Sequence, residues 1–135
     1  MTGLVLVDAN VLLDVLTEDP IWADRSGHAL ARVADEARLA INPIVYAEVS
    51  IGFDRIEDLD ESLSPDTFMR LPLPWAAGFL AGKCFLRYRR SGGERRSPLP
   101  DFYIGAHAAI KGLPLLTRDE GRYRTYLPQL ELITP

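Results

Sequence analysis

Four acidic residues lie at the ends of expected strands or near the starts of expected helices, positions that often carry functional groups: Asp8, Glu48, Asp101 and Asp119. Asp8 and Asp119 each follow a short apolar run that is typical of a buried strand. Glu48 and Asp101 lie near the start of expected helices. In a parallel sheet, the carboxyl ends of the strands and the amino ends of the following helices share one edge, where ligands bind. We therefore expect the four carboxylates to meet at that edge.

Such a cluster needs something to neutralise it. At about 5 Å and an effective dielectric constant near 20, two carboxylates repel by roughly 3 kcal/mol. Protons or a divalent cation could remove this repulsion. All the candidate ligands are oxygens, which favours Mg²⁺ or Mn²⁺ over Zn²⁺. An ion held this way could activate a water, orient a phosphate and stabilise a leaving oxygen, as metal-assisted phosphodiester hydrolysis requires.

Two polar neighbours are candidates for supporting the acids. Asn10 could hydrogen-bond to Asp8 or to a metal-bound water, and Thr117 could orient Asp8 or Asp119. The alternative for both is ordinary turn chemistry. The alternative for Asp8 is that it only caps the helix that follows it. If repulsion dominates, Asp8→Asn or Asp101→Asn should stabilise the metal-free fold while removing activity.

The elements that must position these residues alternate along the chain. Strands are expected at residues 4–7, 38–41, 68–72, 115–116 and 130–133. Helices are expected at 11–16, after a cap at Asp19, after a cap at Asn42, from Pro74 to the Gly92-Gly93 pair, and at 101–111. A solvated helix and loop are expected at 54–66, and a loop at 91–99. This order predicts an α/β fold, a three-layer α/β/α sandwich whose central parallel sheet has four to five strands.

Composition narrows the class of protein. A chain of 135 residues can bury a core as one domain, and we see no internal repeat or linker. Its single cysteine, Cys84, excludes a disulfide framework and suits a reducing cytosol. The first residues lack a basic segment before the apolar run, which argues against a signal peptide. No apolar stretch approaches membrane-spanning length, so we expect no membrane association.

The charge is unevenly distributed. The net charge of −4 does not indicate a nucleic-acid-binding protein. Acidic residues nevertheless gather at 54–66, and basic residues gather at 83–96. An acidic protein can therefore present a local cationic surface that a polyanion would feel within a Debye length of about 8–10 Å.

Four segments resemble, in order, the acidic blocks of the PIN-domain nucleases: 7–10, 42–49, 100–108 and 116–119. The match is closest to the VapC toxins of bacterial toxin–antitoxin pairs, and it continues through residues 121–126. It covers essentially the whole chain. One departure is Ala9, where the family commonly has Thr or Ser, so one possible hydrogen bond is missing while the carboxylates are intact.

The resemblance implies a single PIN domain over residues 1–135 with Mg²⁺- or Mn²⁺-dependent endoribonuclease activity. It also implies a homodimer, inhibition by a VapB-type antitoxin, and a place in the cytoplasm of a prokaryote. Asp8, Glu48, Asp101 and Asp119 become the catalytic, metal-holding acids, and Asn10 and Thr117 match accessory polar positions. The candidate contacts to the RNA backbone are Arg87, Arg89, Arg90, Arg95, Arg96 and Arg118.

Other interpretations stay open at this point. The cluster at 87–96 could be a solvated helix end. Beside Asp119, three arginines could hold the substrate or simply pair with acids: Arg118, Arg122 and Arg124. A phosphatase that uses Asp8 as nucleophile would need a second aspartate two residues on, where this chain has Asn10. A catalytically silent RNA- or protein-binding module on the same fold is the main alternative. Inactive relatives would be expected to lose one or more of the four acids, and this chain has all of them.

Overall fold

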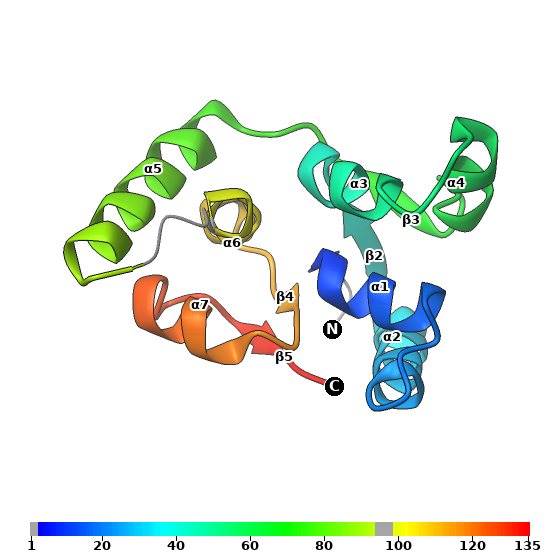
Figure 1. Cartoon of the computed structure of the whole chain (residues 1–135). Helices are drawn as coiled ribbons and strands as arrows, with labels where there is room; N and C mark the ends of the chain where they lie inside the picture. Colours follow the sequence, from blue (N-terminus) through cyan, green and yellow to red (C-terminus); the bar gives the residue numbers. More distant parts are fainter. Residues whose placement is uncertain (1–2, 94–98) are drawn as a thin grey trace.

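The computed structural model of the protein describes residues 3–93 and 99–135. Within these ranges, strands alternate with helices (Figure 1). The strands are β1 (Leu4–Val7), β2 (Arg38–Ile41), β3 (Phe68–Arg70), β4 (Leu115–Leu116) and β5 (Leu132–Ile133). The helices are α1 (Ala9–Leu16), α2 (Ala23–Glu36), α3 (Pro43–Ser50), α4 (Ile56–Ser62), α5 (Trp75–Arg90), α6 (Leu99–Lys111) and α7 (Glu120–Tyr126).

The strands form one parallel sheet in the order β3-β2-β1-β4-β5. The predicted α/β sandwich, with a parallel sheet of four to five strands, is therefore confirmed. β1 lies at the centre, where Val5, Leu6 and Val7 are fully buried. An unbroken apolar run suits this position because helices cover both faces of the strand.

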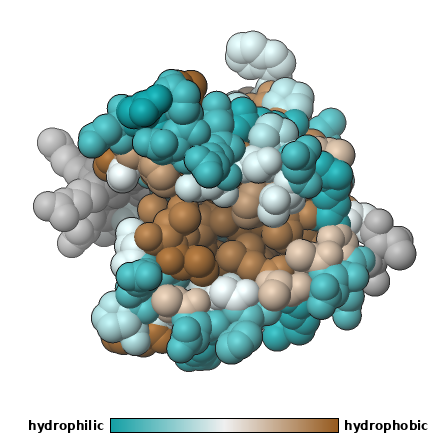
Figure 2. Space-filling view, turned by 90° about the vertical axis from the view of Figure 1, so that its right-hand side faces the viewer, coloured by the Kyte–Doolittle hydropathy of each residue, from teal (hydrophilic) through white to brown (hydrophobic). Residues whose placement is uncertain are grey.

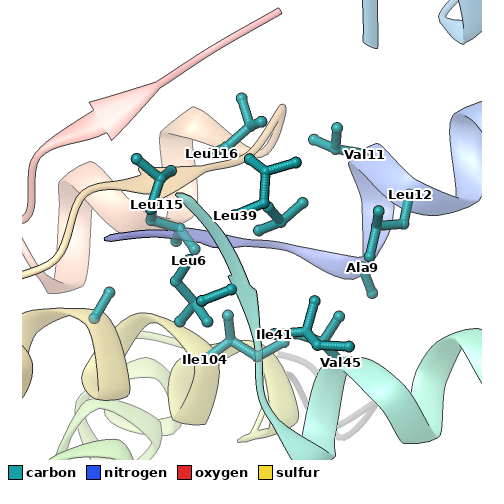
Figure 3. Close-up of a cluster of buried hydrophobic side chains, with 14 of the residues drawn as sticks. Leu6, Ala9, Val11, Leu12, Leu39, Ile41, Val45, Ile104, Leu115 and Leu116 are labelled. Atoms are coloured by element: carbon teal, nitrogen blue, oxygen red, sulfur yellow. The ribbon is translucent and has the colours of Figure 1, made fainter. Parts of the chain in front are cut away.

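The core extends from both faces of the sheet to the surrounding helices. Figure 3 shows side chains of β1, β2 and β4 packing with side chains of α1, α3 and α6. Leu6 and Leu115 are fully buried there, as are Val45 of α3 and Ile104 of α6. This packing fixes the carboxyl ends of the central strands, and with them the residues that follow each strand.

Several boundaries differ from the expected ones. α2 begins at Ala23, because Asp19 Oδ1 instead accepts hydrogen bonds of 2.9 Å from the backbone N–H groups of Ile21 and Trp22 and so holds a separate turn. β5 is shorter than expected. No element was predicted for the segment that forms α7. Its sequence is mostly polar and has Gly121 in the first turn, so apolar periodicity does not reveal the helix.

The surface retains apolar groups. On α5, Trp75 is 94% exposed and Phe79 is 71% exposed. Figure 2 views the molecule from the side that lies on the right in Figure 1. On this face, a broad apolar hollow is surrounded by hydrophilic residues. Across the described ranges, none of the helices has the length and hydropathy to cross a membrane.

Candidate active site

The four acids singled out in the sequence line one cavity of about 390 Å³ at the carboxyl edge of the sheet. We call it the acidic cavity. Its lining residues are Asp8, Asn10, Leu13, Glu48, Asp101, Arg118 and Asp119. Four separate parts of the chain contribute: the β1–α1 junction, α3, α6, and the segment between β4 and α7. The predicted convergence of the carboxylates is thus observed.

Asp8 is the most deeply placed of the four, with 3% of its surface exposed. Three side chains donate to its Oδ2: Thr117 Oγ1 at 2.8 Å, Tyr123 Oη at 2.9 Å and Asn10 Nδ2 at 3.4 Å. Its side chain makes no capping hydrogen bond to α1, so the simple helix-cap interpretation is wrong. Burial raises the pKa of Asp8 to about 6, against the lowering effect of the Thr117 hydrogen bond.

Asn10 and Thr117 connect the two strand ends around Asp8. Asn10 Nδ2 also donates to Thr117 Oγ1 at 3.2 Å, and its Oδ1 accepts from the backbone N–H of Arg118 at 3.3 Å. Thr117 Oγ1 accepts from the backbone N–H of Asp119 at 3.0 Å. These two side chains therefore tie the loop after β4 to the start of α1, and fix Asp8 and Asp119 relative to each other.

Glu48 reaches the acidic cavity from the second turn of α3. The start of that helix is set by Asn42, whose Oδ1 accepts from the backbone N–H of Val45 at 2.9 Å, with Pro43 in the first turn. Burial raises the pKa of Glu48 to about 7, and the charges of Asp101 and Asp8 add to the effect. Its Oε1 is buried without a hydrogen-bond partner among the described residues.

Asp101 and Asp119 share a cation. Arg122 Nη1 lies 2.5 Å from Asp101 Oδ2 and 3.3 Å from Asp119 Oδ2. Burial still raises the pKa of Asp101, with Arg122 opposing and Asp119 adding to the shift. Because the net shift remains upward despite Arg122, the stabilisation expected of Asp101→Asn stays a prediction. Glu48, whose buried Oε1 lacks a partner among the described residues, is a second position where a neutral amide should stabilise the metal-free fold.

The sequence left two roles open for Arg122, holding the substrate or pairing with acids, and the structure shows it paired with acids. It gave no role to Tyr123, the next residue on α7. Tyr123 is 1% exposed, and its hydroxyl lies 3.2 Å from the carbonyl oxygen of Asp101 as well as next to Asp8. Burial and the neighbouring acids raise its pKa well above the ordinary value, so it stays a neutral donor. The matched string at 121–126 was the available signal, but side-chain directions depend on the unexpected helix.

The candidate RNA-contacting arginines occupy different surroundings. Arg118 lines the acidic cavity, yet its Nε and Nη2 donate to Asp14 at 2.8 and 2.9 Å, and it lies over the ring of Trp22. Arg87, Arg89 and Arg90 are exposed in the last turn of α5, outside the lining of the acidic cavity. Arg95 and Arg96 lie outside the described residues.

A divalent ion suits the chemistry of these residues. In the described ranges, no three His, Cys, Asp or Glu side chains are arranged to hold a metal ion as they stand, and Arg122 lies between two of the acids. Nevertheless, all the available donors are oxygens, and a buried carboxylate oxygen of Glu48 lacks a partner. An ion would supply the positive charge that this oxygen requires.

A second cavity, of about 500 Å³, lies between the end of β2, α3, α4 and the segment after β3. Its charges satisfy each other, because Asp60 Oδ1 accepts from Arg70 at 2.8 Å and from the Tyr46 hydroxyl at 2.7 Å. The hydrogen bonds to Tyr46 and Arg70 lower the pKa of Asp60. Its lining is otherwise largely apolar, so the acidic cavity is the better candidate for catalysis.

Comparison with known proteins places this arrangement in context. The sequence profile of the PIN domain matches residues 5–127. The structure of VapBC2 from Rickettsia felis, bound to a promoter DNA fragment, is 19% identical, with a TM-score of 0.72 over 97% of this chain and 98% of that chain. VapBC-1 from Haemophilus influenzae is 17% identical, with a TM-score of 0.72 over 97% of both chains.

A toxin–antitoxin complex from Klebsiella pneumoniae is 23% identical, with a TM-score of 0.70 over 97% of both chains. No curated protein matches the chain. At these identities, the solved structures establish a shared fold.

Proposed function

We propose, from the premise that this chain belongs to the PIN domain family, that it is an Mg²⁺- or Mn²⁺-dependent endoribonuclease and the toxin of a toxin–antitoxin pair. One observation carries the proposal: four carboxylates from four separate chain segments line the acidic cavity. Such a concentration of acids is costly for a fold unless it serves a cation. Residues 1–135 would act as one catalytic domain.

In this proposal, Asp8, Glu48, Asp101 and Asp119 hold the ion. The bound ion would supply Lewis-acid chemistry at the scissile phosphate and its attacking water. Thr117, Tyr123 and Asn10 donate to Asp8 Oδ2 and would hold this carboxylate in place for the ion. Glu48 would release its proton from the carboxylate when the ion binds, since its pKa of about 7 reflects burial among like charges.

The substrate would be RNA in the cytoplasm of a prokaryote, with exposed arginines contacting the backbone. We keep Arg87, Arg89 and Arg90 as candidates for this role, and Arg95 and Arg96 with them. Arg118 is the weakest candidate because Asp14 already engages two of its nitrogens. A guanidinium that is occupied by a carboxylate has fewer donors to offer a phosphate.

The protein partners would be a VapB-type antitoxin and a second copy of the chain. The similar solved structures include toxin–antitoxin complexes, which supports the first partner. The apolar hollow in Figure 2 and the exposed aromatic rings on α5 support protein partners in general, because contiguous apolar surface usually marks an interaction site.

The test is cleavage of RNA by the purified protein with Mg²⁺ or Mn²⁺, with EDTA, and by Asp101→Asn. We expect cleavage that requires the ion and that Asp101→Asn abolishes. Asp35→Asn is the matched control, because it changes an exposed aspartate on α2 away from the acidic cavity. If RNA binds but is left intact under all metal conditions, the silent binding module is the correct interpretation.

A further inference from the structure

Arg122 stands out because both of its partners line the acidic cavity. Its Nη1 bridges Asp101 of α6 and Asp119 at the start of α7. The side chain of Arg122 is 30% exposed, and those of the two acids are 30% and 41% exposed. The bridge therefore lies at the mouth of the cavity, within reach of solvent.

The bridge occupies oxygens that a metal ion would use. Mg²⁺ binds carboxylate oxygens at about 2.1 Å. Arg122 Nη1 is already 2.5 Å from Asp101 Oδ2. A divalent ion on that oxygen would lie close to the guanidinium and repel it. An ion bound to Asp101 Oδ2 and Arg122 in its present position would therefore compete for the same oxygen.

We propose that Arg122 is a displaceable counter-cation of the metal-free site: it neutralises Asp101 and Asp119 until a divalent ion takes its place. This inference rests on the proposed function, because it assigns the divalent ion to the same acids. The partly exposed guanidinium can turn into solvent, and the two acids that it leaves are themselves partly exposed. Once displaced, its five N–H donors are free for a phosphate of the substrate, which a guanidinium binds in bidentate fashion.

Displacement has a measurable cost. Ion pairs at this degree of exposure are weak, so an ion can break them, but their loss still subtracts from the affinity for metal. Removing the guanidinium should therefore tighten metal binding and weaken the metal-free fold. A residue that merely held Asp101 and Asp119 in place for the metal would have the opposite effect on affinity.

The experiment is calorimetric titration of Mn²⁺ into the whole protein and into Arg122→Gln. We expect the variant to bind Mn²⁺ about 5-fold more tightly. It should also melt at a lower temperature in EDTA and recover when Mn²⁺ is added. Arg124→Gln is the matched control: it lies on the same helix, but its partner is Glu120 at 2.8 Å, outside the acidic cavity. Its Mn²⁺ affinity should not change.

Arg122→Lys provides a second variant if Arg122→Gln does not fold. One ammonium group cannot span both acids as the guanidinium does. We therefore expect Arg122→Lys to bind Mn²⁺ more tightly than the unaltered protein, but less tightly than Arg122→Gln. Unchanged or weaker Mn²⁺ binding in the folded variants would overturn the inference while leaving the proposed function intact. Absence of Mn²⁺ binding by the unaltered protein would overturn both.

Discussion

Two arginines in the same short segment pair with acids in opposite ways. Arg118 donates twice to Asp14, which is 2% exposed and also accepts from Ser26 Oγ at 2.7 Å. Arg122 reaches Asp101 and Asp119 through one nitrogen, at the mouth of the acidic cavity. The two arginines are similarly exposed, but the acid of the first pair is buried, whereas both acids of the second pair reach solvent.

The difference lies in the acid rather than in the arginine. Asp14 is buried and needs its partner permanently, since an unpaired buried carboxylate is strongly unfavourable. Asp101 and Asp119 are partly solvated, so their partner can be exchanged for another cation. We conclude that Asp14–Arg118 supports the fold, and that Asp101 and Asp119 are available for chemistry.

The largest expected contrast is in catalysis. Asp119→Asn should reduce RNA cleavage by at least about 100-fold, because it removes a proposed ligand of the divalent ion. Asp14→Asn should leave cleavage within about 3-fold, assayed well below its melting temperature. Initial rates on one RNA at fixed Mn²⁺ concentration measure both. Equal losses of cleavage activity in the two variants would show that Asp14 and Asp119 do not have the separate roles described above.

The second contrast is in stability and runs the other way. Asp14→Ala should lower the free energy of unfolding by about 2–3 kcal/mol, because Arg118 loses two charge-assisted hydrogen bonds and Ser26 loses its acceptor. Asp101→Ala should cost less than about 1 kcal/mol. Urea denaturation in EDTA measures both values. A greater loss at Asp101 than at Asp14 would mean that the open pair carries the fold.

A third prediction concerns pH. With pKa values of about 6 for Asp8 and about 7 for Glu48, the folded protein keeps protons that the unfolded chain, with values near 4, releases. The unfolded state therefore binds fewer protons between about pH 4 and 7, and stability falls as pH rises through this range. In EDTA, the melting temperature should drop by about 5 °C between pH 5 and 8.

Glu48→Gln should flatten this dependence and raise the melting temperature at pH 8, because a neutral amide replaces a buried charge without a partner. Saturating Mn²⁺ should also flatten it in the unaltered protein, since ligands lose their protons on binding. The contrary result is a metal-free melting temperature that rises from pH 5 to 8 in the unaltered protein but not in Glu48→Gln. It would contradict the claim that the folded protein keeps a proton on Glu48.

The smallest effect should come from Tyr123→Phe, which removes one of three donors to Asp8 Oδ2 and keeps the buried ring. We expect cleavage to fall about 5-fold and stability to change by about 1 kcal/mol. Thr117→Val, which removes the shorter hydrogen bond at 2.8 Å, should have an equal or larger effect on cleavage. A silent Tyr123→Phe variant would show that the phenol only packs.

The sequence was most informative where one local pattern leaves a single solution. The short apolar run at β1 favoured a strand buried on both faces, and this placed Asp8 at the ligand-binding edge. Asn42 and Pro43 defined the start of α3 and hence the position of Glu48. These patterns located the acids without any knowledge of contacts between distant segments.

The rest depended on tertiary structure. α7 gains its stability from burying Tyr123 against α6 and Asp8, which the composition of the segment does not reveal. Without the direction of that helix, the sequence could not show that Arg118 pairs with Asp14 while Arg122 pairs with Asp101 and Asp119. The exposure of Asp14 and Asp101, which decides the role of each arginine, is likewise a property of the packed molecule.

The most direct test of the account is anomalous diffraction from crystals of the protein grown with Mn²⁺. We predict a manganese peak in the acidic cavity, bound by oxygens of Asp8 and its three acidic neighbours, with Arg122 turned away from Asp101. A cavity without manganese at millimolar Mn²⁺, with Arg122 still bridging Asp101 and Asp119, would contradict the claim that these carboxylates are gathered to hold a divalent ion.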